Sequence, residues 1–120
     1  MTPFGEAVRK LRARKGVSQK DMAAALNVTP AYLSALEHGK RGTPTFDLLQ
    51  RIAGYFNIIW DEAEDLQRLA GLSDPRIVID TARLSPAATE LANRLARAIG
   101  HFSDADIAAL LEQVRARDPG

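Results

Sequence analysis

The side chains able to do chemistry in this chain are few, and their types exclude most catalytic mechanisms. There is no cysteine, and the two histidines, His38 and His101, lie far apart in the sequence. This composition removes disulfides, thiol nucleophiles and cysteine-type zinc sites, and it leaves too few imidazoles for a metal centre. We therefore expect no metal, no cofactor and no enzymatic activity.

An acidic cluster near the middle of the chain could be interpreted as a carboxylate pair for hydrolysis or for Mg²⁺. Its members are Asp61, Glu62, Glu64 and Asp65. They fall in the first turn of a predicted helix, where the helix dipole favours negative charge. No histidine or lysine lies near them in the sequence to complete an active site. We interpret the cluster as helix-start charge.

The distribution of charge is more informative than the net charge of +1. The first sixty residues hold nine basic against four acidic residues, whereas the remaining sixty hold seven against eleven. Such an asymmetry predicts a basic half that meets a polyanion and an acidic half with another task. Ordinary solvated helix faces are the simpler explanation for the same imbalance.

The length and composition limit the architecture. A chain of 120 residues, 46% hydrophobic and 26% charged, suits one small domain, or one such domain with an appended oligomerisation segment. No apolar run approaches the roughly 18 residues that span a bilayer, and the start of the chain lacks the apolar core of a signal peptide. We expect a cytoplasmic location and no membrane partner.

Helix-capping residues divide the first half of the chain. Thr2-Pro3 and Thr29-Pro30 each offer an N-cap followed by proline at the first helical position, and Ser18 begins a capping-box variant. These signals predict helices over about 3–15, 19–26 and 30–38. Thr43-Pro44 repeats the device ahead of a fourth helix ending near residue 57, and a fifth helix runs from Trp60 to Gly71.

The second half of the chain breaks this pattern. Residues 76–80 form a β-branched run that predicts an extended tether or a short strand, and a strand there would have to pair with its counterpart in a second subunit. Ser85-Pro86 then starts a helix with apolar residues at alternating spacings of three and four, and Ser103 caps a last amphipathic helix.

The apolar seams of these two helices predict subunit pairing. A monomer in which the last two helices fold back on the fourth and fifth is the alternative. The residues expected to mediate dimerisation are Ile77, Val78, Ile79, Leu91, Leu95, Phe102, Ile107, Leu110 and Leu111.

Two capped helices joined by the three residues Asn27-Val28-Thr29, the second helix short and followed by a basic loop, form the helix-turn-helix arrangement. Over about residues 4–70 the chain also resembles the lambda-repressor-like, or XRE-type, helix-turn-helix regulators. The matching residues are Val17-Ser18-Gln19, Met22-Ala23, Leu26-Asn27-Val28-Thr29, Tyr32-Leu33-Ser34, Leu36-Glu37 and Gly39-Lys40-Arg41.

The resemblance implies roles for individual residues. Arg12 and Glu37 resemble the family's internal ion pair, which would make Arg12 a scaffold residue. Gln19 is the first expected DNA contact, since it lies at the start of a helix whose free N–H groups favour a phosphate. The full set of expected DNA-binding residues is Ser18, Gln19, Thr29, Pro30, Ala31, Tyr32, Ser34, His38, Lys40, Arg41 and Thr43.

Direct base recognition by the helix over 30–38 is predicted to be thin. Pro30, Ala31 and Ala35 have no side-chain donor or acceptor, where family members often carry glutamine. Specificity would then depend on DNA shape, on Gln19, or on Lys40 and Arg41 reaching a groove edge.

The sequence therefore predicts an all-α protein: a five-helix, lambda-repressor-like domain over residues 1–72, an extended segment over 73–84 and a two-helix dimerisation element over 85–117. The expected function is a sequence-specific regulator, with repression as the simplest mechanism, that binds a palindromic site in double-stranded DNA as a homodimer. One alternative is an antitoxin-like partner of a toxin protein. Another is a protein-interaction adaptor or RNA binder on the same fold.

Overall fold

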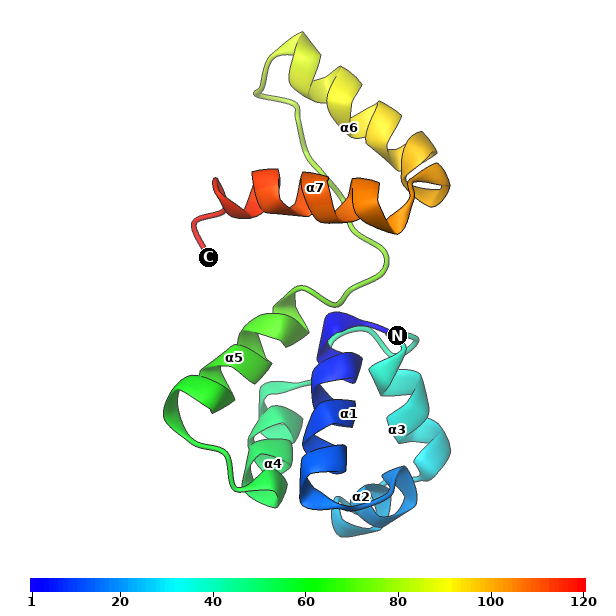
Figure 1. Ribbon diagram of the computed structural model, residues 1–120, viewed down its shortest axis with the longest axis vertical. Coiled ribbons are helices and arrows are strands. Elements are labelled where there is room, and N and C mark those ends of the chain that lie inside the picture. Colours follow the sequence, from blue (N-terminus) through cyan, green and yellow to red (C-terminus); the bar gives the residue numbers. More distant parts are fainter. The chain divides into compact units, whose positions relative to one another are not determined.

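The computed structural model describes residues 1–120 and consists entirely of helices and connecting segments (Figure 1). This confirms the prediction of an all-α protein. The helices are α1 (Pro3–Lys15), α2 (Gln19–Ala25), α3 (Pro30–Glu37), α4 (Phe46–Phe56), α5 (Trp60–Gly71), α6 (Pro86–Ala98), the short 3₁₀ helix η1 (Ile99–His101) and α7 (Asp104–Arg115). The chain divides into two compact units, Met1–Ile77 and Val78–Gly120.

The first three helices begin at the residues that the capping signals indicated. The Thr2 hydroxyl accepts the Gly5 N–H, the Ser18 hydroxyl accepts the Asp21 N–H, and the Thr29 hydroxyl accepts the Tyr32 N–H. Each of these bonds satisfies an N–H group that has no carbonyl partner inside the helix.

The start of α4 corrects one sequence prediction. The helix begins at Phe46 with Thr45 as its N-cap, and not with the predicted pair of Thr43 and Pro44. The Thr45 hydroxyl accepts the Leu48 N–H at 3.2 Å. Thr45 offers the same capping group two residues later, so the loop after α3 extends through Pro44 before the helix begins.

The core of the first unit lies between all five of its helices. Its fully buried side chains come from α1 (Phe4, Val8), α2 (Met22), α3 (Leu33) and α4 (Ile52), and Leu66 of α5 joins them. Gly5 lets α1 approach α3 closely, because a Cβ at this position would collide with the carbonyl group of Glu37.

The last residues of the first unit are fastened to its centre. The Ser73 hydroxyl accepts the Phe4 N–H at 2.9 Å and donates to the Leu69 carbonyl. Pro75 lies against Gly39, since a Cβ on that glycine would be 2.9 Å from the proline Cδ. The chain therefore leaves the unit beside the end of α3.

The second unit has no buried residue. The extended segment that includes the boundary between the units exposes Ile77, Val78 and Ile79 by 70%, 95% and 53%, and no strand forms there within the single chain. Several apolar side chains of α6 and α7 are also exposed, Leu91 by 67%, whereas Leu95 is half-buried. Two helices alone do not enclose a core.

The left-handed turn after α1 provides a test of this fold. Gly16 has a φ of +75°, and no atom lies within 4 Å of the position that a Cβ would occupy, so Gly16→Ala should destabilise the first unit by about 1 kcal/mol through backbone strain alone. Gly54, inside α4, has equally open surroundings without that conformation, so Gly54→Ala should stabilise it by about 0.5 kcal/mol. Urea unfolding of the full chain measures both, and equal effects of the two substitutions would contradict the described turn.

Candidate nucleic-acid interface

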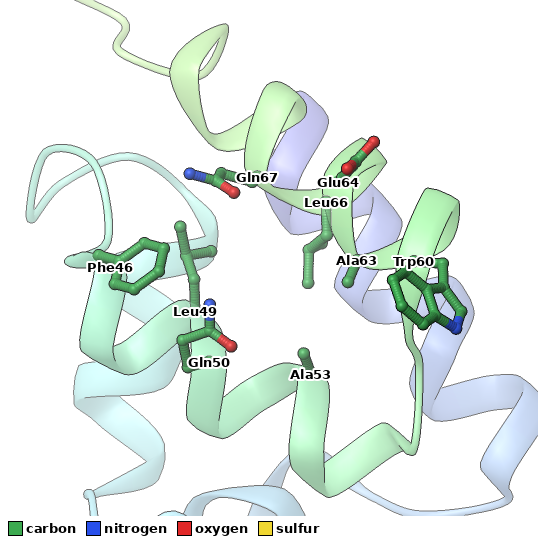
Figure 2. A pocket seen from close by; sticks show the side chains of 9 residues that line it. All are labelled: Phe46, Leu49, Gln50, Ala53, Trp60, Ala63, Glu64, Leu66 and Gln67. Carbon is green, nitrogen blue, oxygen red and sulfur yellow. The ribbon is translucent and has the colours of Figure 1, made fainter.

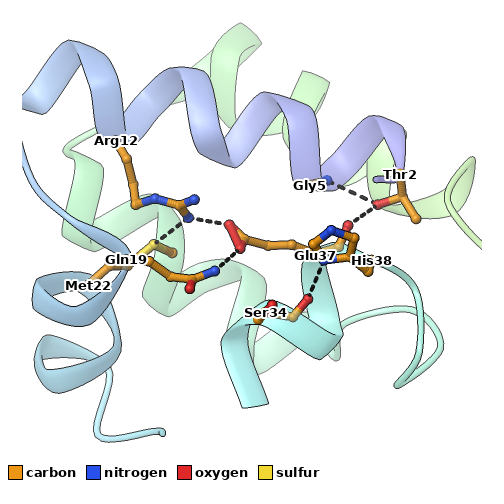
Figure 3. A network of polar contacts seen from close by, with 8 residues as sticks. All are labelled: Thr2, Gly5, Arg12, Gln19, Met22, Ser34, Glu37 and His38. Carbon is orange, nitrogen blue, oxygen red and sulfur yellow. Dashed lines mark hydrogen bonds and ion pairs between the residues drawn. The ribbon is translucent and has the colours of Figure 1, made fainter. Parts of the chain in front are cut away.

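A buried carboxylate holds the first three helices together. Glu37 at the end of α3 is completely buried, and its carboxylate accepts hydrogen bonds from the Arg12 guanidinium of α1 and the Gln19 amide of α2 (Figure 3). The Gln19 Nε2 to Glu37 Oε2 distance is 2.6 Å. The carbonyl oxygen of Glu37 accepts the Thr2 hydroxyl at 2.9 Å. Three helices are thereby fixed around one residue.

The structure brings Arg12 and Glu37 together as an ion pair, as the family resemblance implied. Arg12 is 9% exposed, and its guanidinium also approaches the Met22 sulfur at 3.8 Å. A side chain enclosed in this way cannot reach a nucleic acid. Its position is that of a scaffold residue.

Gln19 has a second role, because its long amide side chain bridges from α2 to α3. A carboxylate can only accept hydrogen bonds, so the amide nitrogen must face Glu37. Its Oε1 atom and one N–H remain free for other contacts. The half-buried Gln19 therefore joins the scaffold as well as lying at the start of α2.

The start of α2 is a closed capping box. The Ser18 N–H donates to the Asp21 carboxylate at 3.1 Å, while the Asp21 N–H donates to the Ser18 hydroxyl at 3.0 Å. The hydrogen bond from the Ser18 backbone lowers the pKa of Asp21 below its usual value and keeps the carboxylate ionised. The Ser18 hydroxyl hydrogen and the N–H groups of Gln19 and Lys20 are the donors left at this helix start.

The surface of α3 offers few groups that could read a base. Thr29, Pro30 and Ala31 are exposed, and the Thr29 hydroxyl already accepts the Tyr32 N–H at 3.0 Å. Ser34 is half-buried, and its carbonyl oxygen lies 2.8 Å from the His38 ring nitrogen Nδ1. The small side chains leave the start of the helix open to close approach.

The loop after α3 supplies exposed positive charge. Lys40, Arg41 and Thr43 are exposed, as is His38 at the end of the helix. Arg41 lies over the aromatic ring of Tyr32, with its guanidinium carbon 5.5 Å from the ring centroid. The Tyr32 ring is half-buried and packs on the core, so this residue contributes to packing as well as to the surface of α3.

Two of the four acidic residues at the start of α5 form ion pairs. Glu62 receives two hydrogen bonds from Arg14, at 2.9 and 3.0 Å, and Asp65 pairs with Arg68 at 2.9 Å. The bond from Arg14 lowers the pKa of Glu62. No three metal-ligating side chains gather anywhere in the chain.

An open hollow of about 420 Å³ lies between α4 and α5 (Figure 2). Phe46 and Trp60 stand at its rim, exposed by 62% and 80%. Glu64 is its one charged lining residue, and no histidine, lysine or arginine completes a reactive group.

None of the helices has both the length and the apolarity that crossing a bilayer requires.

Two contacts between helices of the first unit could not be predicted from the sequence. The Arg51 guanidinium donates to the Leu26 carbonyl, which ties α4 to the end of α2. Lys15 donates to the Tyr55 carbonyl at 2.8 Å and lies over the same tyrosine's ring. Both join residues at least 25 positions apart, and no local spacing predicts such pairs.

Comparison with known proteins finds a family that this arrangement resembles. Residues 8–62 match the sequence model of the helix-turn-helix family. This part of the chain, which includes α2, α3 and the basic loop, is thus similar to that family, and the resemblance to lambda-repressor-like regulators is confirmed over these residues.

Two curated relatives extend the comparison. The chain is 31% identical over 71 residues to the uncharacterized HTH-type transcriptional regulator RghRB of Bacillus subtilis (strain 168), an alignment covering 59% of this chain and 49% of the relative. It is 40% identical over 53 residues to the HTH-type transcriptional regulator DdrOP3 of Deinococcus deserti. This second alignment covers 44% of this chain and 40% of the relative.

The chain thus matches less than half of the length of either relative. No solved structure matches it significantly. The family and both relatives support the expectation that the chain is not an enzyme.

The buried ion pair yields a stability prediction. Arg12→Met should lower the free energy of unfolding by about 3 kcal/mol, because it leaves the enclosed Glu37 carboxylate without its counter-charge. Arg14→Met removes an ion pair of which both side chains are exposed, and it should change stability far less. Urea unfolding of the two variants makes the comparison. Equal losses would show that burial of Glu37 does not determine the effect.

Proposed function

We propose that the chain is a DNA-binding transcriptional regulator that binds a palindromic operator as a homodimer and represses by occupying a promoter. The observation that carries this proposal is the open, small-residue start of α3 beside an exposed basic loop, in a domain of the helix-turn-helix family. The names of both relatives agree with regulation of transcription.

The proposed complex follows from the helix-turn-helix geometry. The first turn of α3 enters the major groove, and the start of α2 lies against the sugar-phosphate backbone. Thr29, Pro30, Ala31, Tyr32 and Ser34 then face the groove. Ser18, Gln19, His38, Lys40, Arg41 and Thr43 flank it and contact phosphates or groove edges.

The homodimer is proposed from the second unit. Its α6 and α7 expose Leu91, Leu110 and Leu111 by 67%, 39% and 42%, and no residue of the unit is buried. A second copy would cover these faces with the same faces, since a two-fold interface is self-complementary. Leu95 lies on α6 and Ile107 on α7, and Phe102 lies in the segment between η1 and α7. The extended residues 77–79 are available to pair with their counterparts.

Two-fold symmetry determines the operator. A dimer places its two α3 helices about 34 Å apart, one turn of DNA, so the half-sites are inverted repeats about 10 base pairs between centres. A single domain with few base-reading groups would discriminate weakly. Pairing two domains multiplies the discrimination of each.

A second class of function is favoured by two observations. The sparse face of α3 suits an RNA binder or protein adaptor that does not read an operator. The uncovered faces of α6 and α7 would equally suit a protein partner, such as a toxin neutralised by this chain. These candidates predict weak, sequence-indifferent DNA binding or a stable complex with another protein.

Selection from a random duplex pool tests operator recognition. We expect an inverted repeat with half-sites about one helical turn apart, bound roughly a thousandfold more tightly than scrambled DNA at the same salt concentration. Uniform affinity for all DNA with a steep salt dependence would contradict the operator and favour the alternatives.

Substitution on α6 tests the subunit interface. Leu91 is two-thirds exposed in the single chain, so Leu91→Glu should preserve the isolated fold and yet convert the dimer into a monomer. Asn93→Glu adds the same charge on another face of α6 and should leave the dimer intact. Sedimentation equilibrium distinguishes the two. Dimers of equal strength in both variants would place the interface elsewhere.

A further inference from the structure

We propose that Arg41 reads a guanine in each half-site and that Tyr32 is the residue that positions it. This inference rests on the proposed function, because it identifies the group that supplies base specificity to operator binding. Two observations carry it: the place of the Arg41 guanidinium on α3, and the absence of other suitable groups on the same face.

The Arg41 guanidinium lies over the ring of a residue that belongs to the first turn of α3. Arg41 follows the end of α3, yet its guanidinium carbon is 5.5 Å from the centroid of the Tyr32 ring. Tyr32 is the third residue of this helix. The Arg41 guanidinium is therefore held against a side chain from the first turn of α3, which is the part that the proposed complex places in the groove.

Tyr32 gives this cation a fixed platform. Its ring is half-buried and packs against the hydrophobic core, so the ring cannot swing freely. A guanidinium over an aromatic ring is held by the attraction between the charge and the π face. That contact uses no N–H donor. Arg41 has no ion pair and no side-chain hydrogen bond within the chain, so its donors stay available for a nucleic acid.

The other candidates on this face lack the required groups. Pro30 and Ala31 carry no donor. Gln19 gives one N–H to the buried carboxylate of Glu37, so its one remaining N–H cannot satisfy both acceptors of a guanine. Lys40 carries a single point charge without a planar fork. A guanine presents two acceptors, O6 and N7, at the spacing that the planar fork of an arginine matches. Arg41 is the side chain here that fits them.

Operator selection with four variants tests the proposal. The wild-type motif should contain a G·C pair in each half-site. Arg41→Lys should lose about tenfold of the discrimination at that pair while keeping the rest of the motif. Tyr32→Leu removes the platform and should weaken the preference at the same pair, whereas Tyr32→Phe keeps the ring and should retain it.

Lys40→Ala is the matched control for charge. It should reduce affinity for all sequences alike and lower the slope of affinity against salt concentration by about one. A loss confined to one base pair is a readout that a general loss of stability does not produce. Arg41→Lys changes an exposed loop residue, so this variant remains folded and decides the test if Tyr32→Leu unfolds.

The failures are distinguishable. If wild-type protein selects a motif and Arg41→Lys lowers affinity uniformly without changing it, Arg41 contacts phosphate and the inference is overturned, while operator binding stands. If wild-type protein selects no motif, the proposed function fails together with this inference. A preference lost with Tyr32→Phe as much as with Tyr32→Leu would remove the positioning role of the ring.

Discussion

The buried carboxylate of Glu37 is the interaction on which the geometry of the interface depends. An ionised group without water must find every partner inside the protein, and the cost of leaving it alone is several kcal/mol. Its partners come from two other helices, through Arg12 and Gln19. Any rotation of α3 against α1 or α2 would break one of these bonds. The orientation of the proposed recognition helix is therefore set by a residue that cannot itself touch DNA.

The two units of the chain satisfy their apolar residues in different ways. The first unit encloses Phe4, Leu33 and Ile52 completely and needs no partner to do so. The second unit encloses nothing, and its helices are held by local caps such as the Ser103 and Asp106 capping box. A stable scaffold thus carries the proposed DNA contacts, and the unit with unsatisfied apolar surface carries the proposed association.

The sequence predicted what depends on neighbouring residues. Thr2, Ser18 and Thr29 identify their helix starts because a cap acts within three residues. The start of α4 was misplaced because Thr43 and Thr45 offer the same hydroxyl, and their local chemistry does not choose between them. The stacking of Arg41 on Tyr32 was missed, since it depends on how the loop after α3 folds back. The predicted domain boundaries and DNA contacts remain predictions.

The packing of Pro75 on Gly39 fixes the start of the extended segment that follows the first unit. Ser73 is bonded to the start of α1, and Pro75 packs on Gly39, two residues after the end of α3. In the proposed dimer, this extended segment would connect the dimerisation helices directly to the end of α3, the proposed recognition helix. A force along this segment would act directly on the end of α3. The distance between the two DNA-binding domains would then depend on the length of the segment. Lengthening or shortening the extended segment would change which spacings between two half-sites the dimer can bind.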